Sequence, residues 1–477
     1  MVEEDETNNN RILQGGEWDR ERWWYKLAHV CRRWRCLILM SASHLGLSLF
    51  CTYGISVADM LAHSPPLPLV IDYIGEARDI TAEEEEKIIL ALRQCDRVRR
   101  IRLLMPVPIL QKLITAVDGE FPMLEYLYIA PPTKHDLGFI LPKTFRAPHL
   151  RHLVLKNFAF PIRSSLLTAG VGLTTLSLMN IHPSAYTHPN ELLRQLSLMP
   201  QLETLGIFFL SPVFSNREVS RQLWNAPIAT QVTLPNLRWF GFQSVSAYLE
   251  AILPHMAMPL LEKLQIFFFH QLRFPVPRLL QFMGAAEHLR LGSARLLFTS
   301  DRLLVDVYPH QEARMYAFEM AISCNYQDWQ VESAAQIFRT LKTVFSAVEH
   351  LTLEFPEYLI VWDRDDAGAG RIRWRQLLMS FGNVKTLRVL GDWSGQISQS
   401  LKVDRGESPT EPLPELNMLE YNAGIFAHIH FQTFIDAREN AGGRPVTLER
   451  IGNNLPRLMK LPRRIPRTLG RAARGKA

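Results

Sequence analysis

The chain has 477 residues, of which 47% are hydrophobic and 21% charged, a composition typical of a globular protein with a sizeable core. Its 53 basic and 47 acidic residues give a net charge of +6, and its five cysteines include no CxxC pair, which excludes a zinc ribbon and a thioredoxin-like motif. Apolar runs such as LGIFFL have the length of a strand, far below the roughly 20 residues of a membrane-spanning helix, so we expect no membrane contact. The N-terminus shows no secretory signal, which favours a reducing compartment, the cytoplasm or the nucleus.

The two ends of the chain differ in composition from its middle. Residues 1–21 open with the polar, acidic sequence MVEEDETNNN, and we expect them to form a flexible N-terminus. Residues 446–477 are expected to form a basic, disordered tail, because nine basic and no acidic residues lie between Arg450 and Ala477. Contact with nucleic acid or with the nuclear import machinery is the alternative interpretation of this tail.

The first predicted element lies within residues 22–64 and is a helix over residues 23–40. Its apolar residues recur at intervals of three and one, which places them on one helical face. This face comprises Leu27, Val30, Cys31, Trp34, Leu37 and Ile38. The arginines between them are expected to be solvated on the other face, with phosphate contacts as the alternative. Cys31 and Cys36 lack the spacing of two metal ligands on one helical face, so no metal site is expected here.

A second helix is predicted to begin after Thr81. The Thr81 hydroxyl can accept a hydrogen bond from the first helical turn, and Glu84 can complete a capping box. The acidic run over residues 83–86 then lies at the positive end of the helix dipole. The acidic cluster therefore has a structural explanation.

One phrase, P-x-L-x-x-L-x-Φ with Φ apolar, recurs along the chain, and it predicts a turn followed by a short strand. The first leucine position of the phrase falls at Val98, Leu124, Leu150, Leu173, Leu202, Leu237, Leu261, Ala286, Val348, Val384 and Leu416. The copies follow one another at 23 to 36 residues, apart from one interval of 62 residues. In that interval, YAFEMAIS (316–323) is predicted to supply another strand.

Segments with helical spacing lie between these phrases, at residues 188–199, 245–256 and 333–345. Strand and helix in regular alternation predict an α/β solenoid over residues 65–445, in which strand–helix units form a curved arc and bury one continuous core. The pattern resembles leucine-rich repeats. Asn157 and Asn180 follow two of the phrases, and the absence of asparagine after most others predicts an irregular arc. A multi-domain α/β protein that reuses PxLxxL turns is the alternative.

The stretch HVCRRWR, followed by SASHL, resembles the second half of an F-box. MLAHSPPLPLVIDY (60–73) then resembles the segment that joins an F-box to irregular leucine-rich repeats in mushroom-type fungal F-box proteins. The motif of the first F-box helix, L-P-x-E-[IL]-L, does not precede Trp23, so the resemblance is to an F-box truncated at its N-terminus.

This resemblance implies a substrate-recognition adaptor of a cullin-based (SCF-type) ubiquitin ligase. The F-box of such proteins binds a Skp-type linker protein, which is attached to the cullin scaffold, and the repeats hold a protein substrate. On matching positions, Leu27, Val30, Cys31 and Trp34 would dock onto the linker. The alternative is a stand-alone leucine-rich-repeat scaffold that has lost linker binding.

No motif for catalysis or for a cofactor was found: the chain has no P-loop, no GxGxxG after a strand, no HExxH and no GxSxG. We therefore expect no enzyme and no cofactor. On a strand, His428 and His430 would share a face and could hold a metal with Asp436, but two histidines are a weak signal. The loop with Asp363, Asp365 and Asp366 lacks the glutamate of a calcium-binding EF-hand, so a solvated loop is expected.

Aromatic residues cluster in two of the predicted strands. Their positions are Trp239, Phe240, Phe242, Phe267, Phe268 and Phe269. Aromatic side chains are common at binding hot spots, but strand alternation places about half of such residues in the core.

Overall fold

The structure is a computed structural model of the chain. It describes residues 23–41, 44–74, 80–116, 119–132, 141, 144–157, 164–168, 170–182, 185, 187–211, 227–286, 288–311, 313, 315–324, 326–355, 367–391, 393–402, 411–422 and 426–451. The chain divides into two compact units. The first lies within Met1–Arg290 and includes Phe318–Cys324, and the second lies within Leu291–Ala317 and Asn325–Ala477.

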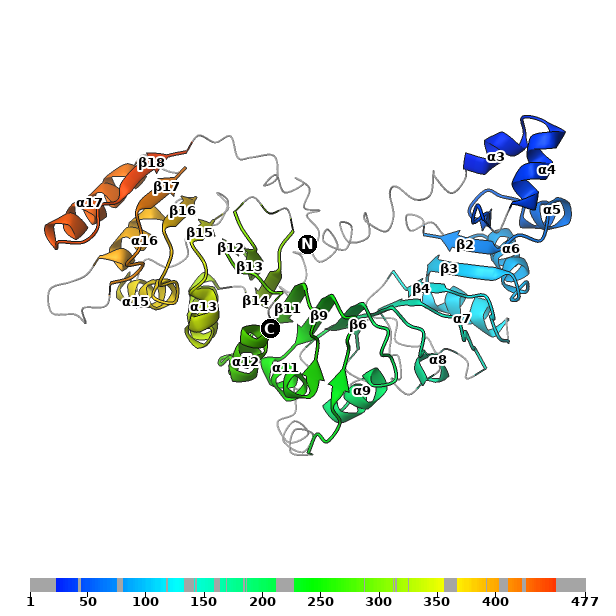
Figure 1. Ribbon diagram of the computed structural model, residues 1–477, viewed down its shortest axis with the longest axis horizontal. Helices are drawn as coiled ribbons and strands as arrows, with labels where there is room; N and C mark the ends of the chain where they lie inside the picture. Colours follow the sequence, from blue (N-terminus) through cyan, green and yellow to red (C-terminus); the bar gives the residue numbers. More distant parts are fainter. Residues whose placement is uncertain are drawn as a thin grey trace, which may run out of the picture. The chain divides into compact units, whose positions relative to one another are not determined.

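A parallel sheet forms the centre of the first unit (Figure 1). Its strands are, in spatial order, β1 (Leu49–Cys51), β2 (Leu69–Tyr73), β3 (Val98–Leu104), β4 (Tyr126–Ala130), β5 (His152–Lys156), β6 (Thr175–Ile181), β7 (Thr204–Phe209), β9 (Trp239–Ser244), β11 (Lys263–Phe268) and β14 (Phe318–Ser323). Two short strands outside this sheet, β8 (Val232–Thr233) and β10 (Met256–Ala257), pair with each other. Parallel neighbours need a crossover between them, and helices supply most of these crossovers.

The helices of the first unit are α3 (Trp23–Ala28), α4 (Arg32–Met40), α5 (Val57–His63), α6 (Ala82–Leu92), α7 (Val107–Thr115), α8 (Ser165–Thr168), α9 (Pro189–Leu196), α11 (Ser246–Ile252) and α12 (Pro277–Ala285), with a 3₁₀ turn η2 (Leu253–His255). The crossover helices lie along one side of the sheet, and the described residues form no helical layer on its other side (Figure 1). We call this second side the open face. The predicted helices within 188–199 and 245–256 are confirmed as α9 and α11, and Thr81 forms the predicted capping box with Glu84.

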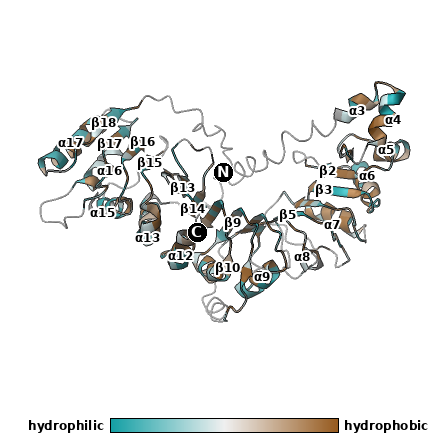
Figure 2. Ribbon diagram, in the orientation of Figure 1, coloured by the Kyte–Doolittle hydropathy of each residue, from teal (hydrophilic) through white to brown (hydrophobic). Residues whose placement is uncertain are grey.

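The core of the first unit lies between the sheet and its helices. Alternate strand residues point to opposite sides, so Phe240 and Phe242 of β9 both face the helices and are fully buried. The ring of Phe242 lies 5.7 Å from the ring of Tyr248 on α11, whose hydroxyl donates a hydrogen bond to the carbonyl of Thr187. Figure 2 shows the hydrophobic residues concentrated along such strands and on parts of the helices.

The recurring phrase marks the strand starts. Most strands begin two residues after its first leucine position: at Leu202, for example, β7 begins at Thr204, and at Leu416, β17 (Met418–Tyr421) begins at Met418. These leucine positions are buried, and their backbone N–H groups bond to the carbonyl three residues before, as at Leu124 with Phe121. The predicted turn followed by a strand is therefore confirmed at these positions.

Asn157 and Asn180 form a short asparagine ladder. Asn157 directly follows β5, and Asn180 lies within β6. Both residues adopt positive φ angles, 63° and 53°, and both are buried. The Asn180 amide donates to the Asn157 side-chain oxygen at 2.7 Å, and the Asn157 amide donates to the carbonyl of Pro131 at 2.7 Å. The Asn157 side chain thus bonds to a backbone carbonyl on one side and to the Asn180 amide on the other, so these buried polar groups have partners.

The second unit has its own sheet and helices. Its strands are, in spatial order, β13 (Arg302–Tyr308), β12 (Ser293–Phe298), β15 (His350–Glu354), β16 (Thr386–Leu390), β17 and β18 (Thr447–Arg450). The pairs from β12 through β15 to β18 are parallel, whereas β12 and β13 are antiparallel. Its helices are α13 (Gln327–Thr340), α14 (Lys342–Phe345), α15 (Ala367–Leu378), α16 (Ser394–Leu401) and α17 (Ala427–Asn440). The prediction of a helix within 333–345 is confirmed by α13 and α14.

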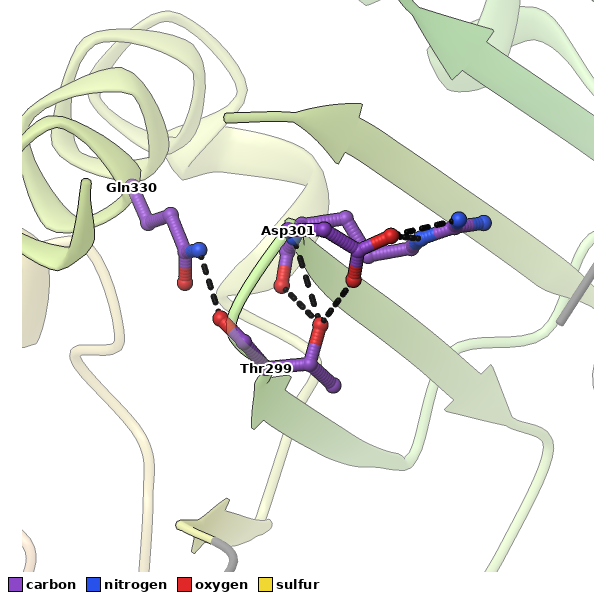
Figure 3. A network of polar contacts seen from close by, with 4 residues as sticks. Thr299, Asp301 and Gln330 are labelled. Carbon is purple, nitrogen blue, oxygen red and sulfur yellow. Dashed lines mark hydrogen bonds and ion pairs between the residues drawn. The ribbon is translucent and has the colours of Figure 1, made fainter. Parts of the chain in front are cut away.

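The antiparallel hairpin β12–β13 corrects one prediction. The phrase at Ala286 forms no strand, and the strand begins at Ser293 instead. The hairpin is closed by a tight turn at Thr299, whose hydroxyl donates to Asp301 at 2.9 Å and accepts from the Arg302 N–H (Figure 3). Gln330 of α13 donates to the Thr299 carbonyl at 2.8 Å and ties the turn to a helix. Such a turn lets the chain fold straight back, without a crossover helix.

Two further predicted segments have different outcomes. The predicted strand within 316–323 is confirmed as β14, which pairs with β11 of the first unit. β18 pairs with β17, so the second sheet includes four residues, Thr447–Arg450, of the segment predicted to be the disordered tail. The remaining tail from residue 452 and the N-terminus to residue 21 lie outside the described residues. The coarse prediction is confirmed: the chain is a mixed α/β protein of strand–helix units around parallel sheets.

Candidate protein-binding surfaces

The first candidate surface lies on α4. The single helix predicted over residues 23–40 is wrong, because the chain forms two helices, α3 and α4, separated by residues 29–31. Cys31 has an extended backbone with φ −158°, and its sulfur accepts a hydrogen bond from the Trp34 N–H. Cys31 therefore acts as the N-cap of a new helix instead of continuing the old one. The Arg35 side chain donates to the carbonyl of Ala28 at the end of α3 and stabilises the break.

The break changes where the predicted linker-binding residues lie. Leu27 remains on α3 and is half-buried, while Val30 lies in the turn with 63% of its surface exposed. Cys31 is exposed at the N-cap, and Trp34 on α4 is 47% exposed. The structure thus brings Val30, Cys31 and Trp34 to the surface near the start of α4, and it does not join them with Leu27 in one helical stripe.

Further apolar side chains extend this surface along α4. Leu37 is 57% exposed and Met40 84% exposed, so with Trp34 they form an apolar series at intervals of three residues. Within α4, Ile38 is the buried residue. We call Val30, Trp34, Leu37 and Met40 the α4 surface. Figure 2 shows α4 with both strongly hydrophilic and hydrophobic residues, as expected from the arginines at its start.

The second candidate surface lies on the open face of the first sheet. There the rings of Phe208, Trp239 and Phe267 form a group that we call the aromatic platform. Phe208 lies 6.2 Å from Trp239 and 6.1 Å from Phe267, measured between ring centroids. Strand alternation places these three residues on the open face.

Two of these three residues, Trp239 and Phe267, are among the six aromatic positions noted in the predicted strands. Of the predicted aromatic positions, Trp239 and Phe267 lie on the open face, whereas the others are buried at 9% exposure or less. The buried residues are Phe240, Phe242, Phe268 and Phe269. Phe208 was not singled out. A signal for it does exist, because Gly206 and Gly241 occupy the same place in two copies of the phrase, four residues after Leu202 and Leu237.

In the second unit, the side of the sheet that carries Arg295 and Arg388 is charged instead of aromatic. Arg295 of β12 lies between two acids, with Glu354 at 2.8 Å and Asp306 at 3.3 Å, and Arg388 of β16 pairs with Glu420 of β17 at 2.5 Å. Burial by itself would lower the pKa of the Arg295 guanidinium, but the two carboxylates raise it above its usual value. These partly buried pairs align neighbouring strands, which is a structural role.

The histidines considered as metal ligands lie on α17, not on a strand. The Nδ1 atom of His428 lies 3.0 Å from the Tyr421 hydroxyl, and that of His430 lies 3.2 Å from the Ser394 hydroxyl. Two residues apart on a helix, their side chains point in different directions. Among the described residues, no group of three or more His, Cys, Asp or Glu side chains could hold a metal ion. The aspartates of residues 363–366 lie outside the described part of the chain.

Neither protein-family models nor curated proteins gave a match to this chain. None of the helices in the described ranges is long and apolar enough to cross a membrane.

A surface hollow of about 440 Å³ lies beside the starts of β5 and β6, lined by Glu125, Pro148, His149, Arg151, Gly172, Thr174 and Gln201. The α4 surface and the aromatic platform are therefore the features from which a function can be inferred.

Proposed function

We propose that this protein is a non-enzymatic adaptor of the F-box type, with irregular leucine-rich repeats, that links a protein substrate to a cullin-based ubiquitin ligase in the cytoplasm or the nucleus. The α4 surface would bind a Skp-type linker protein, and the strand–helix units would bind the substrate. The single observation that carries this proposal is the exposure of large apolar side chains on α4, between 47% and 84% for Trp34, Leu37 and Met40.

Such exposure favours a docking role. Burying apolar surface contributes roughly 25 cal/mol per Å², so a helix with three large apolar side chains in water is stabilised when a partner covers them. An amphipathic helix that presents residues three and four apart is also a common element of protein recognition. In the F-box resemblance, this helix is the part that meets the linker protein.

The array of strand–helix units supports the second half of the proposal. Parallel strands in nearly sequential order, most of them followed by a helix on one side, present an extended open face. The two-residue asparagine ladder at Asn157 and Asn180 supports the assignment to leucine-rich repeats. The alternative function, a scaffold that binds a protein without any ligase, makes use of the same open face.

Binding to a purified Skp-type linker protein tests the proposal. The chain is produced alone, its folding is verified by circular dichroism, and its affinity for the linker is measured by titration calorimetry. Trp34→Ala and Val30→Asp are expected to weaken binding at least about 10-fold, as at other interface hot spots. Trp329→Ala is the matched control, because Trp329 is a similarly exposed tryptophan, 46%, on α13 of the second unit.

The result also decides between the two functions. Linker binding that is lost in Trp34→Ala and kept in Trp329→Ala supports the adaptor. If the folded chain does not bind the linker, the adaptor is wrong and the scaffold is favoured.

A further inference from the structure

The aromatic platform is built on two glycines that lie side by side. Gly206 of β7 and Gly241 of β9 are partners in the sheet register, so two neighbouring strands lack a side chain at the same level of the open face. The platform rings occupy this space. A Cβ atom added at Gly241 would lie 2.4 Å from Cη2 of Trp239 and 2.6 Å from Cζ of Phe208. A Cβ atom at Gly206 would lie 2.7 Å from Cε2 of Phe208.

These distances show that the rings lie across the sheet. A ring that contacts the backbone of the next strand cannot also project away from the sheet, so its outer side forms a low, flat surface. Phe208 is buried beneath its neighbours at 6% exposure, whereas Trp239 and Phe267 are half-buried and present part of their rings to solvent. Flat aromatic rings at the surface are well suited to contact one apolar side chain of a partner.

Apolar residues continue from the platform across the open face. Tyr128, Ala130 and Val154 form a buried cluster on β4 and β5, against which Leu104 and Met179 also pack. All of them lie on the same side of the sheet as the platform, on β3 to β6, and Met179 of β6 is on the strand next to Phe208 of β7. The open face of the first unit thus differs from the sheet of the second unit, where paired Arg, Asp and Glu side chains lie across neighbouring strands.

Charged side chains of the strands give this face a positive balance. Four bases and two acids project onto it, a difference of +2: the bases are Arg100, Arg102, Lys156 and Lys263, and the acids are Asp72 and Glu319. Asp72 lies 3.4 Å from Arg102, and Glu319 accepts a hydrogen bond from Gln265 at 3.0 Å, so both acids have partners within the sheet. Lys263 is the register partner of Trp239, one strand spacing away.

We propose that the aromatic platform is the binding site for an acidic segment of a partner protein, which places one aromatic or long aliphatic side chain on Trp239 and Phe267. The acidic residues beside this anchor complement Lys263 of β11 and, further along the sheet, Lys156 of β5. The partner is a substrate only if the proposed adaptor function holds, but the binding site does not depend on the α4 surface.

A synthetic peptide tests the site directly. The probe is a short fluorescein-labelled peptide with a central tryptophan between runs of aspartate and glutamate, and its binding to the full chain is followed by fluorescence anisotropy. Two comparison peptides replace the acids by lysines or the tryptophan by serine. The acidic tryptophan peptide is expected to bind at least about 10-fold more tightly than either comparison peptide.

Variants locate the binding. Trp239→Ala is expected to weaken binding at least about 10-fold, and Trp329→Ala on α13 should not change it. Gly241→Ala keeps the tryptophan but displaces its ring, so it should weaken binding as well. Gly284→Ala is its matched control, because a Cβ atom at Gly284 would have no atom within 4 Å. If Trp239→Ala does not fold, Gly241→Ala and Phe267→Ala carry the test.

Several outcomes overturn the inference. One is equal binding of the acidic and the basic peptide, and another is unchanged binding in Trp239→Ala and Gly241→Ala. A third outcome is tested with a single-stranded oligothymidine, since aromatic rings next to Lys or Arg side chains also bind nucleic acid. If the oligonucleotide binds at the platform and the acidic peptide does not, the site is a nucleic-acid site. Unchanged linker binding in Trp239→Ala keeps this test separate from that of the adaptor function.

Discussion

Asn157 and Asn180 illustrate how single side chains hold neighbouring units of the first sheet together. Both residues have positive φ angles, which asparagine tolerates better than most residues other than glycine. Asn157 is the central member, because its amide donates to the Pro131 carbonyl and its oxygen accepts from Asn180. Removing this side chain would break the bonds to Pro131 and to Asn180 at once.

We expect Asn157→Ala to lower the free energy of unfolding by about 2–4 kcal/mol. The change leaves buried polar groups without partners and puts alanine in the left-handed region. Urea unfolding followed by circular dichroism measures the difference. Asn236→Ala is the control, because Asn236 is only half-buried and its solvent-exposed bond to Gln201 is 3.3 Å long, so a change within about 0.5 kcal/mol is expected. Equal losses in both variants would contradict the role given to Asn157.

Ionisation of the Cys51 thiol makes the free energy of unfolding depend on pH in the alkaline range. Its thiol is fully buried, and burial raises its pKa from 9.0 to about 12, against a smaller lowering by Arg97. In the unfolded chain the thiol loses its proton near pH 9, whereas in the folded chain it keeps the proton up to about pH 12. The contribution of Cys51 to stability is therefore complete below pH 9 and is lost as the pH rises towards 12.

We expect the free energy of unfolding to fall more steeply between pH 9 and pH 11 in the wild type than in Cys51→Ala. One group contributes at most about 1.4 kcal/mol per pH unit. Burial also raises the pKa of Tyr73, so a residual slope should remain in the variant. Cys36→Ala, which removes an exposed thiol, should keep the wild-type slope. Identical slopes in all three proteins would show that Cys51 ionises normally.

At the scale of elements, the strands were easier to predict than the helices. The phrase combines a buried leucine, a turn and an apolar strand within a few residues, so local sequence suffices to place its start. The break between α3 and α4 was not predictable in this way, because the apolar spacing runs through it. It depends on the extended backbone of Cys31 and on the bond from Arg35 to Ala28, which form only in the folded helix pair.

Trp34 and Trp374 differ in burial, so their substitution should affect the free energy of unfolding differently. Trp34 is 47% exposed, whereas Trp374 of α15 is 2% exposed and lies between the rings of Phe298, Phe355 and Trp393. We expect Trp34→Ala to change the free energy of unfolding by less than about 1 kcal/mol and Trp374→Ala to lower it by about 3–5 kcal/mol. Thermal and urea unfolding of both variants measures this. A large loss in Trp34→Ala would mean that Trp34 belongs to the core.

At the scale of the whole molecule, the repeated strand–helix architecture could be predicted from the spacing of the phrases, but the division into two units could not. Two features of the sheet topology depend on contacts between residues that are distant in the sequence. The antiparallel hairpin β12–β13 interrupts the series of crossovers, and β14 returns to pair with β11. The aromatic platform was missed for the same reason, since Gly206 and Gly241 become neighbours only through the register of β7 and β9.

The central claim is that this molecule carries two separate protein-binding surfaces, the α4 surface and the aromatic platform. The most direct test measures the binding of the Skp-type linker protein and of the acidic tryptophan peptide to the wild type, Trp34→Ala and Trp239→Ala. We predict that Trp34→Ala loses only the linker and that Trp239→Ala loses only the peptide, each by at least about 10-fold. If either variant, properly folded, loses both ligands, or if neither variant loses any, the claim of two separate surfaces is wrong.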